Sequence, residues 1–359
     1  MKCIVEGIIL LEFFKNKKVF ITGHTGFKGI WLSYILLTQG ADVTGYSLEP
    51  SDKECLYYLT NIKKDINSHI GDVRDYEHLC RVFNQSSPEI VIHLAAQPLV
   101  RESYKNPRYT FETNIMGTVN LLECIKNSNT VKSLVNVTTD KVYKNNEWSW
   151  GYREDDIIFG GDPYSNSKSC SELVTKSYAD AFLMDKGVSV STVRAGNVIG
   201  GGDFSKDRII PDCIKYVRNK ETIVVRNPNS VRPYQHVLEP LYAYLMIAQK
   251  QYENNKYSGQ YNIGPDDNQC ITTGELVDLF CKKWGSDSKW INVSQDNIKE
   301  ASFLKLDISK IKTTFKWKPK WNIEKAIDKT IEWTKAYLNN EDIETLMRSQ
   351  ILDYEEYGE

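Results

Sequence analysis

The chain has 359 residues, of which 41% are hydrophobic and 26% are charged, and its formal net charge at pH 7 is −2. This composition is that of a globular protein and excludes a disordered chain. A nearly neutral charge gives no electrostatic reason to expect nucleic acid or an anionic membrane as a partner. The length allows one large core with a smaller lobe beside it.

The N-terminal segment is apolar over residues 3–14, but Glu6 and Glu12 interrupt it. It is too short to span a bilayer, and it lacks the basic flank and small-residue cleavage site of a secretory signal. We therefore expect residues 1–16 to be a leader that packs on the edge of the first domain. The protein is expected to be cytoplasmic, without a membrane partner.

The cysteines and histidines show no metal-binding pattern. None of the eight cysteines forms a Cys-x-x-Cys pair, and the five histidines have no ligand spacing with them. The cysteines are predicted to be reduced, buried thiols, and no metal site is predicted.

The chain from residue 17 onward alternates short β-branched runs with stretches of helical period. Parallel strands need crossover helices, and a sheet covered on both faces has nearly continuous apolar strands. The pattern predicts an α/β fold with a doubly wound parallel sheet of the Rossmann type over residues 17–196. The expected strands are 18–22, 42–46, 89–94, 133–138 and 188–194.

The pattern becomes irregular after Gly196, where glycines and prolines interrupt it. We predict a smaller α/β substrate-binding lobe over residues 197–345, partly interleaved with the first domain, and a C-terminal tail over 346–359 that is frayed from residue 353. The expected helices in this half are 238–251, 273–284 and 323–338, the last after a tight turn at 317–321.

A glycine-rich turn follows the first strand at Gly23, Gly26 and Gly29. The first glycine allows the tight turn, the second lets the backbone approach a pyrophosphate at the helix N-terminus, and the third permits close helix–strand packing. Because the turn follows the first strand of an alternating chain, a dinucleotide site is favoured over a plain strand–helix turn. The predicted cofactor contacts here are Gly23, Thr25, Gly26, Phe27, Lys28 and Gly29.

Other cofactor contacts are expected at the ends of neighbouring strands. Lys28 is a candidate phosphate contact, although a solvated surface lysine explains it equally well. The second strand ends at residues 45–47 with no acidic residue for a ribose 2′-hydroxyl and no arginine for a 2′-phosphate, so NAD is favoured over NADP. The predicted contacts beyond the turn are Asp72, Val73, Ala95, Ala96 and Gln97.

Tyr164 and Lys168 are four residues apart at the start of a predicted helix, which places the phenol and the ammonium on one face. A neighbouring ammonium favours the phenolate, so the tyrosine is predicted to act as a base toward a sugar hydroxyl. Tyr252 and Lys256 have the same spacing but no cofactor context. Thr139 and Asp140 follow the strand at 133–138, and Asp140 is interpreted as a general acid or, alternatively, as a turn cap.

These motifs resemble the extended short-chain dehydrogenase/reductase family, in its nucleotide-sugar epimerase and dehydratase branch. The stretches that carry the general resemblance are 23–29, 139–141 and 164–168. A narrower resemblance, to the 4,6-dehydratases whose substrate is CDP-glucose, rests on residues 22–29, 95–101, 139–141, 194–203 and 232–237.

The resemblance implies bound NAD and a reaction in which C4 of the sugar is oxidised, water is lost across C5 and C6, and the hydride returns to C6. Thr139, Asp140, Lys141, Tyr164 and Lys168 would be the catalytic residues, with Lys141 as C5 base or enolate stabiliser. It adds Asn114 to the cofactor contacts, and it implies a homodimer or dimer of dimers through the helices at 101–127 and 164–185. The substrate contacts that it implies are Asn197, Arg208, Arg232 and His236.

Other activities on the same scaffold remain open at this point. They are a 4-epimerase, a 4-keto reductase, a dehydratase of another nucleotide sugar, and a non-catalytic NAD-sensing protein. Asp140 favours elimination, because a simple epimerase needs no acid for a leaving group, and an intact Tyr164, Lys168 and Thr139 set argues against a sensor.

Overall fold

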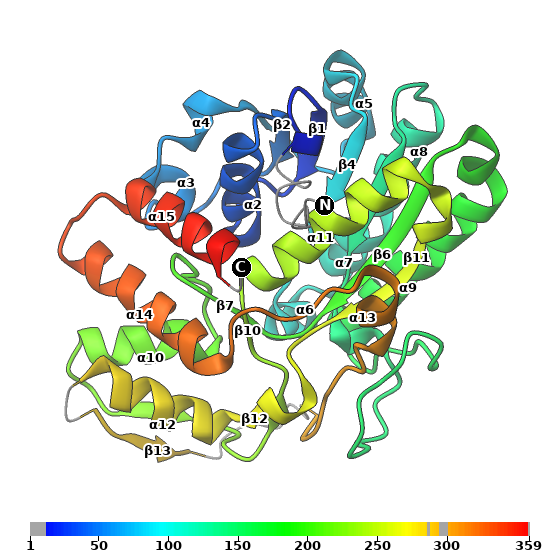
Figure 1. Ribbon diagram of the computed structural model, residues 1–359. Helices are drawn as coiled ribbons and strands as arrows, with labels where there is room; N and C mark the ends of the chain where they lie inside the picture. Colours follow the sequence, from blue (N-terminus) through cyan, green and yellow to red (C-terminus); the bar gives the residue numbers. More distant parts are fainter. Residues whose placement is uncertain (1–11, 286–287, 294–300, 358–359) are drawn as a thin grey trace, which may run out of the picture.

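The computed structural model describes residues 12–285, 288–293 and 301–357 (Figure 1). Its centre is a sheet of seven strands in the order β11-β6-β5-β4-β1-β2-β3, and every neighbouring pair is parallel. The predicted doubly wound fold is thereby confirmed. The strands are β1 (Lys18–Thr22), β2 (Asp42–Ser47), β3 (Asn67–Ile70), β4 (Ile90–His93), β5 (Ser133–Val137), β6 (Ser189–Ala195) and β11 (Gly259–Ile263).

The five strands expected from the sequence form within one or two residues of their predicted limits. Every residue of β4, β5 and β6 is buried, as expected for strands that are covered on both faces. Strand β11 was not expected. It comes from the C-terminal half and pairs with β6 at the edge of the sheet, so the two halves of the chain share one sheet.

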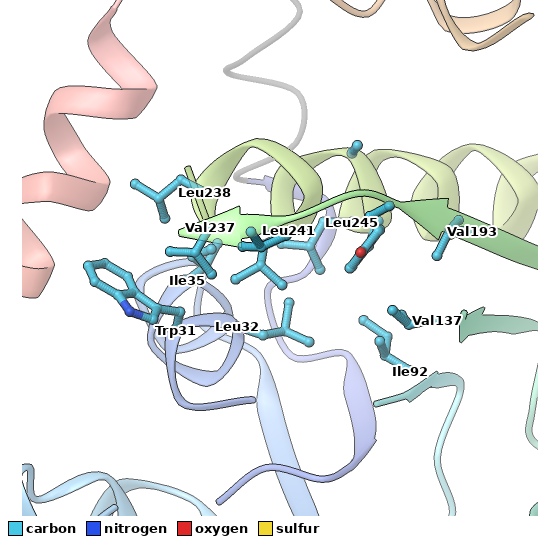
Figure 2. Close-up of a cluster of buried hydrophobic side chains, with 14 of the residues drawn as sticks. Trp31, Leu32, Ile35, Ile92, Val137, Val193, Val237, Leu238, Leu241 and Leu245 are labelled. Carbon is cyan, nitrogen blue, oxygen red and sulfur yellow. The ribbon is translucent and has the colours of Figure 1, made fainter. Parts of the chain in front are cut away.

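Helices cover both faces of the sheet. Helices α2 (Phe27–Thr38) and α11 (Leu238–Glu253) belong to the core on one face. In Figure 2, Leu32 of α2 and Leu241 and Leu245 of α11 lie on the side of the two helices that faces the labelled residues of β4, β5 and β6, whereas Trp31 points away from these strands. The other face is covered by helices α5 (Tyr76–Ser86), α8 (Gly117–Lys126) and α9 (Pro163–Tyr178).

The segment between β4 and β5 differs from the single helix expected over 101–127. Pro107 has no backbone N–H and restricts Asn106 to a non-helical conformation, so the helix ends at Lys105 and restarts at Pro107. The segment consists of α6 (Val100–Lys105), α7 (Pro107–Phe111), the π-helical turn η1 (Glu112–Met116) and α8.

The smaller lobe has its own apolar cluster, formed by helices and short strands. Its helices are α10 (Ile209–Arg218), α12 (Thr273–Trp284) and α14 (Ile323–Leu338), and the expectations for the last two and for α11 are confirmed. Its short strand pairs are β7 (Val198–Ile199) with β10 (Gln235–His236), β9 (Val231–Arg232) with β12 (Ile271–Thr272), and β8 (Ile223–Val225) with β13 (Trp290–Asn292).

Short elements complete the described chain. They are α3 (Leu56–Leu59), α4 (Ile62–Asp65), η2 (Asp140–Val142), η3 (Ala179–Leu183), η4 (Met184–Lys186), η5 (Asn255–Tyr257), η6 (Asp267–Gln269) and α13 (Ser309–Phe315).

The C-terminal tail is helical where the sequence predicted fraying. Helix α15 (Ile343–Glu356) packs against α14 and α2, and it continues through most of the charged segment. Tyr354 is buried, and its hydroxyl donates to Glu239 Oε2 at 2.9 Å. The expectation of a frayed end is therefore wrong for residues 353–356, because a buried and hydrogen-bonded tyrosine holds the helix in place.

At the other end, residues 1–11 of the expected leader lie outside the described residues. Phe14 is fully buried in the core of the α2 face. The seven described cysteines are free thiols, and two of them, Cys124 and Cys213, are buried. Within the described part of the chain, no helix is both long and apolar enough to cross a membrane.

Candidate active site

A cleft of about 1250 Å³ runs along the carboxyl ends of the parallel strands. The sheet order reverses between β1 and β4, and ligands of doubly wound folds bind at such a reversal. The smaller lobe closes the opposite side of the cleft. The lining includes residues that directly follow six of the seven strands: Gly23 after β1, Leu48 after β2, Gly71 after β3, Leu94 after β4, Thr138 after β5 and Gly196 after β6.

The glycine-rich turn forms one wall, and all six residues predicted there line the cleft. Gly23 has a φ of +81°, and an added Cβ would lie 2.8 Å from Ala95 N. A Cβ at Gly29 would lie 2.2 Å from Gly23 O, so helix α2 and the turn can approach this closely only with glycine. Thr25 Oγ1 is 2.8 Å from Ser47 Oγ and ties the turn to the end of β2.

The far end of this wall carries Asp72 and Val73, which both line the cleft. The Asp72 carboxylate accepts from Arg74 Nε and Nη2, at 3.0 and 2.6 Å to Oδ2. Beyond β2, Glu49 and Asp52 also line the cleft, so acidic residues lie close to where the sequence analysis found none in the strand itself.

Five predicted catalytic residues meet at the middle of the cleft, on η2 and at the start of α9. Asp162 caps α9 by accepting from Ser165 N at 3.0 Å, and Pro163 occupies its first turn. The helix thereby begins directly before Tyr164. The Lys168 ammonium donates to Val137 O, the last residue of β5, at 3.1 Å.

Asp140 lies beside these groups and is almost fully buried. Its Oδ1 accepts from Thr139 Oγ1 at 3.0 Å and from Lys141 Nζ at 3.2 Å. Its Oδ2 is buried and has no partner among the described residues. A buried carboxylate oxygen without a partner is costly, so this atom is suited to meet a polar group of a ligand.

The acid strengths at the site are set mainly by burial. Burial raises the pKa of Tyr164 to about 12, against a hydrogen bond from Thr139 and the charge of Arg208, which lower it. Burial also lowers the pKa of Lys168 to about 8. In the protein alone, desolvation of the phenolate therefore outweighs the hydrogen bond from Thr139 and the charge of Arg208.

Lys28 lies in the same cleft and is partly buried, so the alternative of a fully solvated surface lysine does not apply. Its nitrogen is 5.9 Å from the centre of the Tyr244 ring. Burial, with the charges of Arg208 and Lys168, lowers the pKa of Lys28 to about 7.

The opposite wall carries three of the four predicted substrate contacts, Asn197, Arg208 and Arg232. Arg208 Nη1 donates to Asp203 Oδ2 at 3.1 Å. Arg232 is buried, and its guanidinium donates to Val231 O at 2.9 Å and to Ala301 O. Asn197 Oδ1 is buried without a partner among the described residues.

The model of the GDP-mannose 4,6 dehydratase family matches residues 20–330. The chain belongs to this family. Among curated relatives, the CDP-glucose 4,6-dehydratase of Salmonella typhimurium is 45% identical over 349 residues, which cover 96% of this chain and 97% of that protein. The UDP-glucuronate 4-epimerase of Thermodesulfobacterium geofontis is 28% identical over 326 residues, which cover 88% and 95%.

Solved structures of nucleotide-sugar enzymes have the same fold. The UDP-glucose 4-epimerase of Thermotoga maritima, solved with UDP-glucose, has a TM-score of 0.79 at 23% identity and covers 89% of this chain and 99% of that one. The dTDP-glucose 4,6-dehydratase of Bacillus anthracis, solved with NAD, has a TM-score of 0.76 at 20% identity and covers 91% and 99%. At these identities the likeness shows the fold of the family.

Three predicted site residues of this family member do not line the cleft. Gln97 turns inward, where its amide donates to Leu99 O and Thr110 Oγ1 at 3.1 and 2.8 Å. Asn114 donates to Ser167 Oγ at 2.8 Å and accepts from Gln97 N at 2.8 Å. Both predictions of a direct cofactor contact are wrong, because these amides satisfy buried polar groups behind the cleft wall.

His236 is the third correction. It is fully buried, with ring centres 6.1 Å from Trp31 and 4.9 Å from Trp321. Burial lowers its pKa to about 3. It is therefore a core histidine between two tryptophans, and the prediction of a substrate contact is wrong.

The cleft also contains charged residues to which the sequence analysis assigned no role. Arg101, Asp207 and Arg226 line it and come from three separate segments. Arg101 lies inside the 95–101 stretch that carried the family resemblance, so a signal existed for it. Asp207 and Arg226 lie in the irregular half, where spacing gives no indication of what faces the cleft.

The described residues contain no group of three or more histidine, cysteine, aspartate or glutamate side chains arranged to hold a metal.

Proposed function

We propose that this protein converts CDP-D-glucose to CDP-4-keto-6-deoxy-D-glucose and water. The observation that carries the proposal is the meeting of two chemical pairs in one cleft, Tyr164 with Lys168 and Asp140 with Lys141. The first pair suits proton removal from a hydroxyl, and the second suits loss of a hydroxyl from the neighbouring part of the same sugar. The identity to the Salmonella typhimurium enzyme over nearly the whole chain supports CDP-glucose as the substrate.

The glycine turn fits NAD. The tight turn, which a Cβ at Gly23 or Gly29 would force apart, lies at the N-terminus of α2, where backbone N–H groups favour a pyrophosphate. Glu49 and Asp52 beyond β2 disfavour the extra phosphate of NADP, which supports the prediction of NAD. When bound there, NAD⁺ accepts a hydride from the sugar and later returns it.

The residues of the chain supply the proton transfers. Tyr164 takes the proton of the O4 hydroxyl, and Lys168 stabilises the phenolate that this role requires. The 4-ketone makes the C5 proton acidic, and Asp140 gives a proton to the departing C6 hydroxyl. Lys141, whose nitrogen is 3.2 Å from Asp140 Oδ1, takes the C5 proton as the free amine when the hydroxyl leaves, and it returns a proton to C5 when the hydride reaches C6. The net change is loss of one water, with no net oxidation.

A panel of nucleoside diphosphate-glucoses tests the substrate. The protein is incubated with CDP-, dTDP-, UDP- and GDP-glucose, and products are separated by chromatography and read by mass spectrometry. Loss of one water from CDP-glucose alone is the expected result. Preferential conversion of another nucleoside diphosphate-glucose would show that CDP-glucose is not the substrate. A 4-epimer of unchanged mass would show that the reaction is an epimerisation.

We also propose a cytoplasmic homodimer, or a dimer of dimers, that serves deoxysugar synthesis for a surface polysaccharide. Exposed apolar side chains on the segments predicted to form the contact support the dimer, and free thiols support a reducing compartment. The apolar side chains are Tyr104, Met116, Leu173, Phe182 and Met184. Light scattering of the protein and of Leu173→Glu tests it, with dissociation of the variant expected.

A further inference from the structure

Three charged side chains from different parts of the chain meet across the cleft. Arg101 belongs to α6 beside the large sheet, Arg226 directly follows β8 of the smaller lobe, and Asp207 lies in the loop before α10. Asp207 Oδ1 is 2.9 Å from Arg226 Nη1 and 3.6 Å from Arg101 Nε. One carboxylate oxygen thus joins arginines from the two walls.

The geometry points to Asp207 as an internal substitute for the substrate diphosphate, held between Arg101 and Arg226 until a nucleoside diphosphate displaces it. Guanidinium groups bind phosphate and carboxylate oxygens with the same donor geometry, so either anion satisfies the pair. The inference rests on the proposed function, because it takes a nucleotide sugar to be the ligand of this cleft.

Asp207 is the carboxylate of this wall that is best able to leave. Its side chain is 43% exposed, whereas that of Asp203, which holds Arg208, is 4% exposed. Partly exposed ion pairs contribute little net free energy, so exchange of the partner is inexpensive. Asp207 also has a φ of +61°, in the left-handed region that aspartate and asparagine tolerate.

The charges of the wall explain why a substitute is useful. Arg226 has a second carboxylate within reach, Asp212 Oδ2 at 3.6 Å, so each cation of this cluster has an acidic neighbour before substrate arrives. A diphosphate that takes the place of Asp207 contacts both lobes at once. Binding of the nucleotide is therefore coupled to the relative position of the two walls.

The test measures affinity for CDP and for inorganic diphosphate by calorimetry on the full chain. Asp207→Asn keeps the backbone conformation and removes the competing charge, so both ligands are expected to bind about threefold more tightly. Arg101→Gln and Arg226→Gln are expected to weaken both by roughly tenfold, with partial recovery in Arg226→Lys. Cytidine, which has no phosphate, is expected to bind equally to all variants.

Arg153→Gln is the matched control, since Arg153 forms a comparable pair with Asp307 at 3.1 Å but does not line the cleft. A purely structural Asp207 would make Asp207→Asn less stable on heating and no tighter for CDP, and either unchanged or weakened affinity overturns the inference. If CDP-glucose is not converted while Asp207→Asn still tightens CDP, the proposed function fails and the substitute stands. If CDP-glucose is converted normally but Asp207→Asn binds CDP with unchanged affinity, the inference about Asp207 is wrong and the proposed function stands.

Discussion

The two walls of the cleft hold their polar groups in different ways. On the wall of β5 and α9, Asp140, Tyr164 and Lys168 are each less than a tenth exposed and are surrounded by hydrogen bonds to neutral groups as well as ions. On the lobe wall, Arg208 and Arg226 have side chains about a third exposed and paired with carboxylates. Proton transfer needs acid strengths shifted by burial, whereas anion binding needs charges that can change partners.

The wall of β5 and α9, called the buried wall below, is reinforced from behind by an ion pair. Arg194 of β6 donates from Nε and Nη2 to the two Glu172 oxygens at 2.9 and 2.8 Å, and Thr138 Oγ1 donates to Glu172 Oε1 at 2.5 Å. Glu172 is one helical turn beyond Lys168 on α9, and Thr138 directly precedes Thr139. Glu172 therefore joins the helix that carries Tyr164 and Lys168 to the end of the strand that precedes Thr139.

The buried wall is most directly broken at Tyr164. In Tyr164→Phe, turnover is expected to fall by about two to four orders of magnitude, because the general base is removed. Binding of NAD is expected to persist, because the phenol is not part of the glycine turn. Turnover and NAD binding are measured on the same preparation. Tyr252→Phe is the control at the other Tyr-x-x-x-Lys spacing, and full activity in Tyr164→Phe contradicts the assignment.

Lys141→Met tests the role of the Asp140–Lys141 pair separately from that of the Tyr164–Lys168 pair. Removal of the ammonium beside Asp140 is expected to slow turnover about a hundredfold and to halt the reaction after C4 oxidation. Reduced nicotinamide then accumulates on the enzyme and is visible by its absorbance. Normal product release without that absorbance removes Lys141 from the mechanism.

The pH dependence of the free energy of unfolding tests how strongly burial shifts the pKa values of interior histidines. Burial lowers the pKa of His93 and His236 to about 3 and that of His24 to about 4, whereas histidine in an unfolded chain titrates near about 6.5. The unfolded state thus binds more protons below about pH 6.5, and the free energy of unfolding falls with acid by up to about 1.4 kcal/mol per pH unit for each histidine.

Glu239 gives the opposite slope and serves as the control. Burial raises its pKa to about 7, so its contribution is full below the unfolded pKa and is lost as the pH rises toward about 7. In Glu239→Gln the acid-side loss of stability is expected to be steeper than in the parent protein. Urea unfolding between about pH 7 and pH 5 measures both slopes, and equal slopes would show that Glu239 is ionised in the folded state.

The smallest expected effect is that of Arg208 on the lobe wall on the pKa of Tyr164 on the buried wall. The charge of Arg208 lowers the pKa of Tyr164, which acts as a base, so Arg208→Gln is expected to move the ascending, acid-side limb of the pH–rate profile to higher pH. Loss of its charged hydrogen bonds is expected to raise KM roughly tenfold. A raised KM with an unmoved pH profile would confine Arg208 to binding.

The sequence predicted the buried wall well because its signals are local. The glycine turn, the β5 end and the start of α9 each lie within one strand, turn or helix, and their residues meet because parallel strands end at one edge. Gln97, Asn114 and His236 were misplaced because the direction of a polar side chain depends on distant partners such as Thr110, Ser167 and Trp321.

The lobe wall was predicted less completely, for a physical reason. Its strands are two or three residues long, too short to show periodicity, and its ion pairs join separate segments. The predicted arginines came from family resemblance, whereas Arg226 and Asp207 became visible only with the fold. Strand β11 was likewise missed, because Gly259, Gln260 and Asn262 leave its five residues without the apolar run of the other strands.

The central claim is that the same sugar molecule is oxidised at C4 and reduced at C6 before it leaves the active site. CDP-glucose labelled with deuterium at C4 tests it, with the product examined by NMR and mass spectrometry. The account predicts one deuterium in the new C6 methyl group, formed without added reductant. Deuterium released to solvent, or retained at C4 in a 4-epimer, would contradict it.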